Sequence, residues 1–221
     1  MSQIISVPDH ILYEDEYILV VDKPAGLMVE PDRNGYPNLL HQVRAYVRAT
    51  MPSGEEAYAQ HIHRLDRPVS GVILFAKKRS VLKNLSEQFA ERKVRKYYQC
   101  MTEKTPGIIN GRLTHWLRKE KKKAIIYDQE TEFSEKAILD YRVAGAGKER
   151  FLWDIELQTG KYHQIRAQLA HIRCPIVGDE MYGSVIPYRK DAIALQAYKL
   201  VFMHPVTEEE LSIKSGAFGV V

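Results

Sequence analysis

The sequence predicts an α+β fold: a mixed, largely antiparallel central sheet with peripheral helices and a central cleft. Most of the strand-like segments follow one another without an intervening helical segment, which favours this class over a doubly wound parallel sheet. The chain has 221 residues, of which 45% are hydrophobic, enough for one sizeable core. We therefore expect a single domain over residues 1–221, either as one body or as two lobes that meet near the Pro/Gly-containing connection at 104–111.

In the first half, the expected strands are short, apolar and bounded by turn residues, and the expected helices repeat apolar residues at three- and four-residue spacing. The segment YILVVDK, for example, is ended by Pro24 and Gly26. Asn38 and Ser80 are suited to cap two helices, because such side chains accept hydrogen bonds from the unpaired N–H groups of a first turn. The expected elements are strands at 17–23, 71–78 and 97–102, and helices at 38–50 and after Ser80.

The second half is richer in strands, because its segments of β-branched and aromatic residues are bounded by turns. One helix is expected at 162–172, where Ile165, Leu169 and Ile172 share a face. Arg166 would lie beside this buried face, where an arginine usually has a carboxylate partner. The pattern does not identify that partner. The expected strands are at 124–127, 137–143, 151–157 and 193–202.

Composition argues against several classes of protein. No apolar run approaches the roughly 18–20 residues that span a bilayer, so we expect no membrane association. The first 22 residues contain five acidic residues and neither Lys nor Arg, the reverse of the basic start of a signal peptide. Cys100 and Cys174 are far apart and form no metal-binding or disulfide pattern. These features predict a cytoplasmic protein.

The positive charge is concentrated in one segment. The formal net charge is only +4, yet residues 91–123 contain 11 basic and three acidic residues, which leaves the remainder of the chain net acidic. Such a segment can be a solvated helix face. It can equally bind a polyanion, because Lys and Arg neutralise phosphates and release counterions.

The segment HIHRLDRPVSG at 61–71 places one carboxylate, Asp66, among basic side chains directly before a predicted strand. Arg64 or Arg67 could keep Asp66 ionised, since a nearby cation lowers the pKa of a carboxylate. The simpler interpretation is a surface salt bridge that orders a turn. A metal site with His61 and His63 is a third interpretation, but histidines two residues apart alternate faces on an extended chain and no H-E-x-x-H motif is present.

A second segment, Lys96-Tyr97-Tyr98, lies where the basic segment enters a predicted strand. Neighbouring strand residues point to opposite faces, so only one of the two tyrosines can face a given cleft. Such a tyrosine can pack in the core, or in an RNA enzyme it can stack on an unpaired base.

Together these segments resemble a known family. HRLDRPVSG, the K-x-Y at 96–98, GKYHQIRAQLA followed by PIVGD and YG, and a late His204-Pro205 occur in the order found in the RluA-type family of RNA pseudouridine synthases. The opening ILYEDEY with VDKPAGL is also similar to that family. The resemblance extends from about residue 11 to residue 213, nearly the whole chain.

This resemblance implies isomerisation of uridine to pseudouridine in ribosomal or transfer RNA, without a metal or an organic cofactor. Asp66 matches the catalytic aspartate of the family, and Tyr98 matches its active-site tyrosine. Arg166 matches the arginine that pairs with the aspartate, and Arg64 matches the arginine that enters the space vacated by the flipped nucleotide. The chemistry fits these residue types: the base must leave its stack, and a carboxylate can then act as a nucleophile or remove a sugar proton.

The chain departs from the family pattern in two respects. Lys161 and Tyr162 stand where the family most often has Arg and Thr, which keeps the charge and changes the contacts around the pocket. We also expect no separate N-terminal RNA-binding module, because strand signals begin near residue 11. The catalytic domain would then hold RNA itself, and the basic residues of the 91–123 segment are the candidates. The RNA-binding candidates are Arg64, Lys119, Lys121, Lys122 and Lys123.

Two other functions remain open. One is a non-catalytic RNA-binding protein that keeps the fold, which the set of Asp66, Tyr98 and Arg166 disfavours because binding alone needs no carboxylate facing a polyanion. The other is a metal-dependent hydrolase that uses His61, His63 and Asp66. For the favoured function, the expected partner is RNA, no protein partner is implied, and we expect a monomer.

Overall fold

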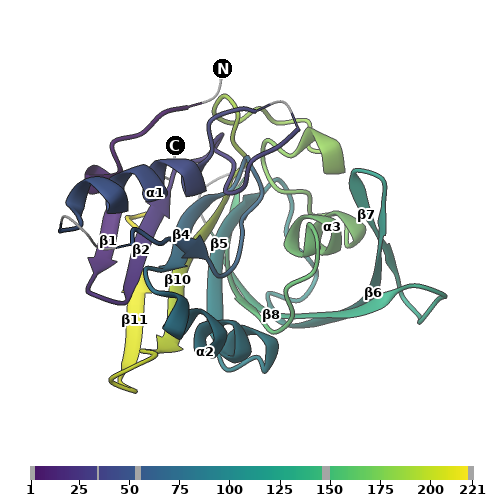
Figure 1. Ribbon diagram of the computed structural model, residues 1–221. Coiled ribbons are helices and arrows are strands. Elements are labelled where there is room, and N and C mark those ends of the chain that lie inside the picture. Colours follow the sequence, from purple (N-terminus) through teal and green to yellow (C-terminus); the bar gives the residue numbers. More distant parts are fainter. Residues whose placement is uncertain (1–2, 34, 53–55, 146–149, 219–221) are drawn as a thin grey trace. The chain divides into compact units, whose positions relative to one another are not determined.

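The computed structural model describes residues 3–33, 35–52, 56–145 and 150–218, and the chain divides into two units (Figure 1). The first comprises Met1–Val94 and Ala197–Val221, and the second comprises Arg95–Gln196. The division therefore does not fall at the predicted connection at 104–111. The physical reason is strand pairing: β5 (Arg95–Thr102) and β9 (Phe151–Leu157) form one antiparallel pair, so both sides of that connection belong to the same sheet.

The first unit contains strands in the order β1, β2, β4 and β10, with β3 paired to β4 and β11 paired to β10. The pairs β1–β2, β2–β4, β3–β4 and β10–β11 are antiparallel. Its elements are η1 (Val7–His10), β1 (Ile11–Glu14), β2 (Ile18–Lys23), α1 (Leu39–Thr50), β3 (Gln60–His61), β4 (Ser70–Ala76), α2 (Arg79–Ala90), β10 (Leu195–Met203), which begins at the end of the second unit, and β11 (Glu210–Lys214).

Helices cover both faces of this sheet. On β2, Leu19 and Val21 pack in one cluster with α1, whereas Ile18 and Val20 pack in another cluster with α2. This alternation follows from the two-residue period of a strand. A strand that is buried on both faces carries consecutive apolar residues, which is why the ILVV run of YILVVDK is so evident in the sequence.

In the second unit the strand order is β5, β9, β8, β6, β7, and all four pairs are antiparallel. The sheet curves around α3, as Figure 1 shows. Ala167 on α3 packs with Leu117, Ala124 and Ala137 of the sheet. The remaining elements are β6 (Asn110–Glu120), β7 (Lys123–Tyr127), β8 (Glu135–Gly145), α3 (Gln164–His171) and η2 (Glu180–Tyr182).

The predicted fold class is confirmed, but two helix starts are wrong. The Asn38 cap is present, with its side chain accepting from the His41 N–H. Ser80 is not a cap, because α2 begins at Arg79. Helix α3 begins only at Gln164, because His163 before it adopts a left-handed conformation (φ 52°). No helix in the described part of the chain is long and apolar enough to cross a membrane.

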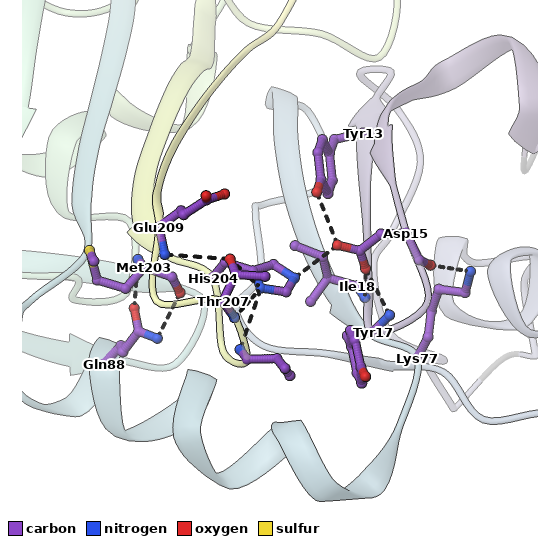
Figure 2. Close-up of polar contacts among 11 residues, drawn as sticks. Tyr13, Asp15, Tyr17, Ile18, Lys77, Gln88, Met203, His204, Thr207 and Glu209 are labelled. Carbon is purple, nitrogen blue, oxygen red and sulfur yellow. Dashed lines mark hydrogen bonds and ion pairs between the residues drawn. The ribbon is translucent and has the colours of Figure 1, made fainter.

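Asp15 and His204 join the two sequence-distant parts of the first unit (Figure 2). His204 is buried, and its Nε2 lies 2.8 Å from Asp15 Oδ2. Its Nδ1 accepts from the Thr207 N–H at 3.0 Å, so Nε2 carries the proton that is donated to Asp15. Asp15 also accepts from the Tyr17 and Ile18 N–H groups. His204 of the late His-Pro motif is therefore tied into the fold by both ring nitrogens.

The Asp66 loop is held by a buried lysine at the end of β2. Lys23 is fully buried, and its Nζ donates to the carbonyl oxygens of Pro24 (3.0 Å), Leu27 (2.8 Å) and Arg67 (3.3 Å). Burial lowers the pKa of Lys23 to about 7, against the opposing effects of the Asp66 and Asp22 charges. The turn after β2 and the loop after β3 are therefore joined through one amine.

Gly71 should be intolerant of any side chain. Its φ is 121°, and a β-carbon there would lie 2.2 Å from the Ala197 carbonyl oxygen. We expect Gly71→Ala to lower the free energy of unfolding by about 3 kcal/mol or more in denaturant titration. Gly183→Ala is the matched control, because Gly183 also has a positive φ of 94° but open space around it. Equal losses for the two variants would show that the backbone clash at Ala197 is unimportant.

The contribution of Lys23 to stability should depend on pH. An unfolded chain keeps the lysine proton up to its ordinary pKa of 10.5, whereas the folded chain releases it near 7. The unfolded state therefore binds more protons between these values, and stability rises with pH across that window. We expect the difference in free energy of unfolding between wild type and Lys23→Met to grow by about 2–3 kcal/mol from pH 7 to pH 9. A constant difference in urea titrations over that range would contradict the lowered pKa.

Candidate functional site

Asp66 lies in the loop between β3 and β4 and is half-buried. Its backbone carbonyl accepts from the Val69 N–H at 3.1 Å, which closes a turn. The next residue, Arg67, forms two hydrogen bonds with Gly26. The Gly26 N–H donates to the Arg67 carbonyl at 2.8 Å, and Arg67 Nε donates to the Gly26 carbonyl at 3.1 Å. With the Lys23 contact, these bonds fix the backbone on the C-terminal side of Asp66.

Arg64 is exposed near the same loop and forms an ion pair with Glu30, with Nη1 2.5 Å from Oε2. The other carboxylate oxygen of Glu30 lies 2.9 Å from His61 Nε2. Sequence reasoning missed Glu30, because an acidic residue 34 positions away carries no local signal. Arg64 therefore has Glu30 as its carboxylate partner, and the expected salt bridge of Asp66 stays a prediction.

The predicted alternative metal site is not assembled. His63 Nε2 accepts from the Leu74 N–H at 3.2 Å, and its ring stacks on Phe89. His61 is engaged with Glu30 instead. The two histidines thus serve different neighbours, as expected for residues that alternate faces. This arrangement does not support a hydrolase that uses His61, His63 and Asp66.

Among the described residues, one group of three metal-ligating side chains has ligand atoms that all lie within 4.8 Å of one another: His115, Asp128 and His171. The hydrogen bonds there disfavour a metal. Gln168 Nε2 lies 3.2 Å from the Ala137 carbonyl and 3.1 Å from His115 Nδ1. Because a carbonyl only accepts, the amide nitrogen faces both atoms and Nδ1 accepts, which leaves the proton on Nε2. Burial, and secondarily His171, also lower the pKa of His115. This group is therefore a hydrogen-bonded cluster in which His115 is neutral.

Tyr98 lies on β5 of the second unit, half-buried and opposite Ile155 of β9, while Tyr97 lies opposite Glu156. The two tyrosines therefore face opposite sides of the sheet, as predicted. The K-x-Y segment is also close to the GKYHQIRAQLA segment, since a β-carbon at Gly160 would lie 3.3 Å from Lys96 Nζ. The structure thus joins these two sequence motifs within one unit.

Arg166 is buried on α3, with 4% of its surface exposed, and has the carboxylate partner that its position predicted. Its Nε lies 2.7 Å from Asp179 Oδ2, and its Nη2 lies 2.9 Å from Oδ1. This two-point contact fixes the plane of the guanidinium. Asp179, which is 1% exposed, belongs to the PIVGD motif, and the sequence alone did not assign it this role.

Asp66 lies in the first unit, whereas Tyr98 and Arg166 lie in the second. Their convergence on one cleft remains a prediction from the family resemblance.

Tyr182 of the YG motif lies beside Arg166. The guanidinium carbon of Arg166 is 5.1 Å from the centre of the Tyr182 ring, and the Tyr182 hydroxyl lies 3.0 Å from His163 Nδ1. Burial raises the pKa of Tyr182 to about 12, so its hydroxyl keeps its proton at neutral pH. The same oxygen accepts from the Ala124 N–H at 2.8 Å. The hydroxyl therefore donates to His163 and holds β7 against the start of α3.

Two groups stand out among the basic residues of the 91–123 segment. Three residues are neutralised locally: Arg112 makes a two-point contact with Asp140, Arg118 pairs with Glu120, and Lys93 pairs with Glu91. A second group consists of the exposed lysines at the β6–β7 turn, which within the described part of the chain form no ion pair with an acidic side chain. We call this second group the lysine turn; it comprises Lys119, Lys121, Lys122 and Lys123.

Comparison with known proteins agrees with the motifs. A family model described as RNA pseudouridylate synthase matches residues 17–171. The chain is 33% identical over 207 residues to "Uncharacterized RNA pseudouridine synthase YhcT" of Bacillus subtilis (strain 168), which covers 90% of this chain and 65% of that protein. It is 30% identical over 232 residues to "tRNA pseudouridine synthase C" of Pasteurella multocida (strain Pm70), and this match covers 93% of this chain and 90% of that protein. A third relative is "Ribosomal large subunit pseudouridine synthase D" of Zymomonas mobilis, at 29% identity over 93% of this chain and 68% of that protein.

Solved structures share the fold. The chain superposes on "Human RNA Pseudouridylate Synthase Domain Containing 4" with a TM-score of 0.78 over 95% of this chain and 89% of that chain, at 22% identity. The chain spans about two thirds of the length of the B. subtilis relative. The matched residues 17–171 include Asp66, Tyr98 and Arg166. Because the family model matches more than half of the chain, this protein belongs to the RluA-type family of RNA pseudouridine synthases.

Proposed function

We propose that the protein isomerises specific uridines to pseudouridine in structured RNA, with Asp66 as the catalytic carboxylate. The observation that carries this proposal is the Asp66 loop. A carboxylate set between two arginines in the sequence is held half-buried by backbone bonds to the β2 turn and by buried Lys23. A surface salt bridge that only orders a turn contributes little to stability. It would not require that the backbone of the loop be held in this way.

The reaction sets the requirements for the site. The bond from the sugar to ring nitrogen must break, and a bond from the sugar to ring carbon 5 must form. The base must first leave its stack, at a cost of a few kcal/mol. Asp66 then either adds to the sugar or the base as a nucleophile, or removes a sugar proton to give a glycal-type intermediate. In this proposal, Tyr98 stacks on the detached uracil and helps to remove the carbon 5 proton.

Arg166 has a supporting role in this proposal. Its positive charge keeps Asp66 ionised in a dry pocket, where an unpaired carboxylate would take up a proton. The Asp179 contact supports this role, because it fixes the direction in which the rest of the guanidinium points. Arg64 would enter the space that the flipped nucleotide leaves, and its exposure is compatible with an exchange of Glu30 for RNA. Such an exchange costs little free energy, since an exposed ion pair is worth about 0–1 kcal/mol.

The substrate class is RNA, and the names of the relatives give two candidates. One relative is named for the large ribosomal subunit and another for transfer RNA, at similar identity to this chain. Mapping pseudouridines across total RNA from cells with and without the gene distinguishes the two.

Asp66→Asn and Asp66→Ala should abolish isomerisation and leave the fold and RNA binding largely intact, because only the reacting carboxylate is lost. Release of tritium from carbon 5 of labelled uridine in RNA measures the reaction. Glu30→Gln is a matched control, since it also removes a carboxylate from this region but should keep activity. An Asp66→Ala protein that still releases label would contradict the assignment. A wild-type protein that binds RNA and leaves every uridine unchanged would favour the non-catalytic alternative.

Replacing all four residues of the lysine turn by glutamine should weaken RNA binding and flatten its salt dependence. Each phosphate contact adds about 0.9 to the slope of log affinity against log salt on a duplex, and about 0.7 on a single strand. Fluorescence anisotropy with a labelled RNA stem–loop at several salt concentrations measures the slope. Arg112→Gln is the control, because Asp140 already neutralises that side chain. An unchanged slope would return the lysine turn to the solvated-surface interpretation.

A further inference from the structure

Tyr162, one of the two residues that differ from the commonest family motif, forms a hydrogen bond with the lysine turn. Its hydroxyl lies 3.2 Å from the Lys122 carbonyl oxygen and donates to it. Lys119 Nζ lies 4.5 Å from the centre of its ring, which is a cation–π distance. Its ring also stacks on His163, with centroids 3.8 Å apart and an interplanar angle of 16°. One side chain thus contacts both the lysine turn and the residue before α3.

The β6–β7 turn needs such a contact, because its own sequence does not favour its shape. Glu120 pairs with Lys123, so the connection consists of Lys121 and Lys122 alone. Two-residue hairpins prefer Asn-Gly or similar pairs, which tolerate left-handed backbone. Here Lys121 takes a left-handed conformation (φ 51°), which costs about 1–3 kcal/mol for a residue other than glycine. Tertiary contacts must therefore help to hold this turn.

Further contacts connect Tyr162 to the buried Arg166. His163 is held between the Tyr162 ring and the Tyr182 hydroxyl, and the Tyr182 ring lies beside Arg166. The Ala124 N–H on the same hairpin donates to that hydroxyl as well. The hairpin is thus attached to the start of α3 at two points, Lys122 and Ala124, and Arg166 lies in the first turn of α3.

We propose that Tyr162 is a positioning residue, which fixes the lysine turn relative to Arg166 so that its lysines meet RNA phosphates at a set distance from the reacting nucleotide. The inference rests on the proposed function, since it assumes RNA as the substrate. Tyr162 does not itself touch RNA in this role. A threonine at this position, as in the commoner family pattern, is too short to make the same ring contacts. In this proposal, the lysine turn and Tyr162 therefore act as one unit.

A double-mutant cycle on RNA affinity tests this role. The probe is a fluorescein-labelled, unmodified RNA stem–loop, and Kd is measured by anisotropy. Tyr162→Phe removes only the hydroxyl bond and should raise Kd about threefold. Tyr162→Leu removes the hydroxyl and the ring and should raise Kd about tenfold. In a protein whose four turn lysines are glutamine, either change should raise Kd less than about twofold, because nothing remains to be positioned.

The salt dependence adds a readout that a purely structural role would not move. Tyr162→Leu should flatten the salt slope in the wild-type background and leave it unchanged in the lysine-free background. Tyr46→Phe is the matched control, because it removes a comparable hydroxyl bond, to Glu14 at 2.8 Å, in the first unit and should leave Kd unchanged. If Tyr162→Leu fails to fold in a thermal melt, Tyr162→Phe carries the test.

Three results would overturn the proposal. An equal rise in Kd in both backgrounds would mean that Tyr162 contacts RNA itself. No rise in the wild-type background, or wild-type affinity in the lysine-free protein, would mean that the turn is not an RNA-binding element positioned by Tyr162. Failure of the proposed function is distinguishable, because it appears as absent tritium release from a protein whose binding cycle still behaves as expected.

Discussion

The placement of Asp66 depends on one buried amine. Lys23 has no contact with water, and burial of a charge is costly unless it is compensated. Its three carbonyl partners match the three N–H donors of an ammonium, whereas a neutral amine has only two. Hydrogen bonding and the carboxylates of Asp66 and Asp22 therefore favour the charged form, while burial favours the neutral form. A pKa near 7 is the balance of these effects, and the same amine holds the loop that carries Asp66 through the Arg67 carbonyl.

The second unit organises its charge differently. Arg166 is buried and held by a two-point contact with Asp179, which suits a residue whose orientation matters. Arg112 and Arg118 are neutralised on the surface by neighbouring acids. The lysine turn presents several positive charges together without acidic partners among the described residues. The basic segment thus contains residues that are neutralised locally and lysines available for a polyanion.

The elements that sequence reasoning placed well are those whose local pattern and burial agree. β2 opens with four buried apolar residues because both of its faces are covered, and the Asn38 cap uses a bond to the nearby His41 N–H. β6 was missed because Asn110–Glu120 lies mostly at the surface and lacks a continuous apolar run. The Asp179 and Glu30 contacts could not be predicted either, since each joins residues that only the folded chain brings together. The resemblance supplied roles, whereas only the structure supplied these neighbours.

Two of the seven described non-glycine residues with positive φ belong to the candidate site. His163 and Lys121 are left-handed without being glycine, and each conformation costs stability that surrounding contacts must offset. Tyr162 contacts the first of these residues through its ring and holds the turn that contains the second through the Lys122 carbonyl. Natural sequences tend to depart from local preferences at functional sites, because function there requires a geometry that local preference does not give. The same side chain that changes the family motif therefore supports two strained backbone positions, which is a physical reason for Tyr162 and the lysines of the turn to occur together in this chain.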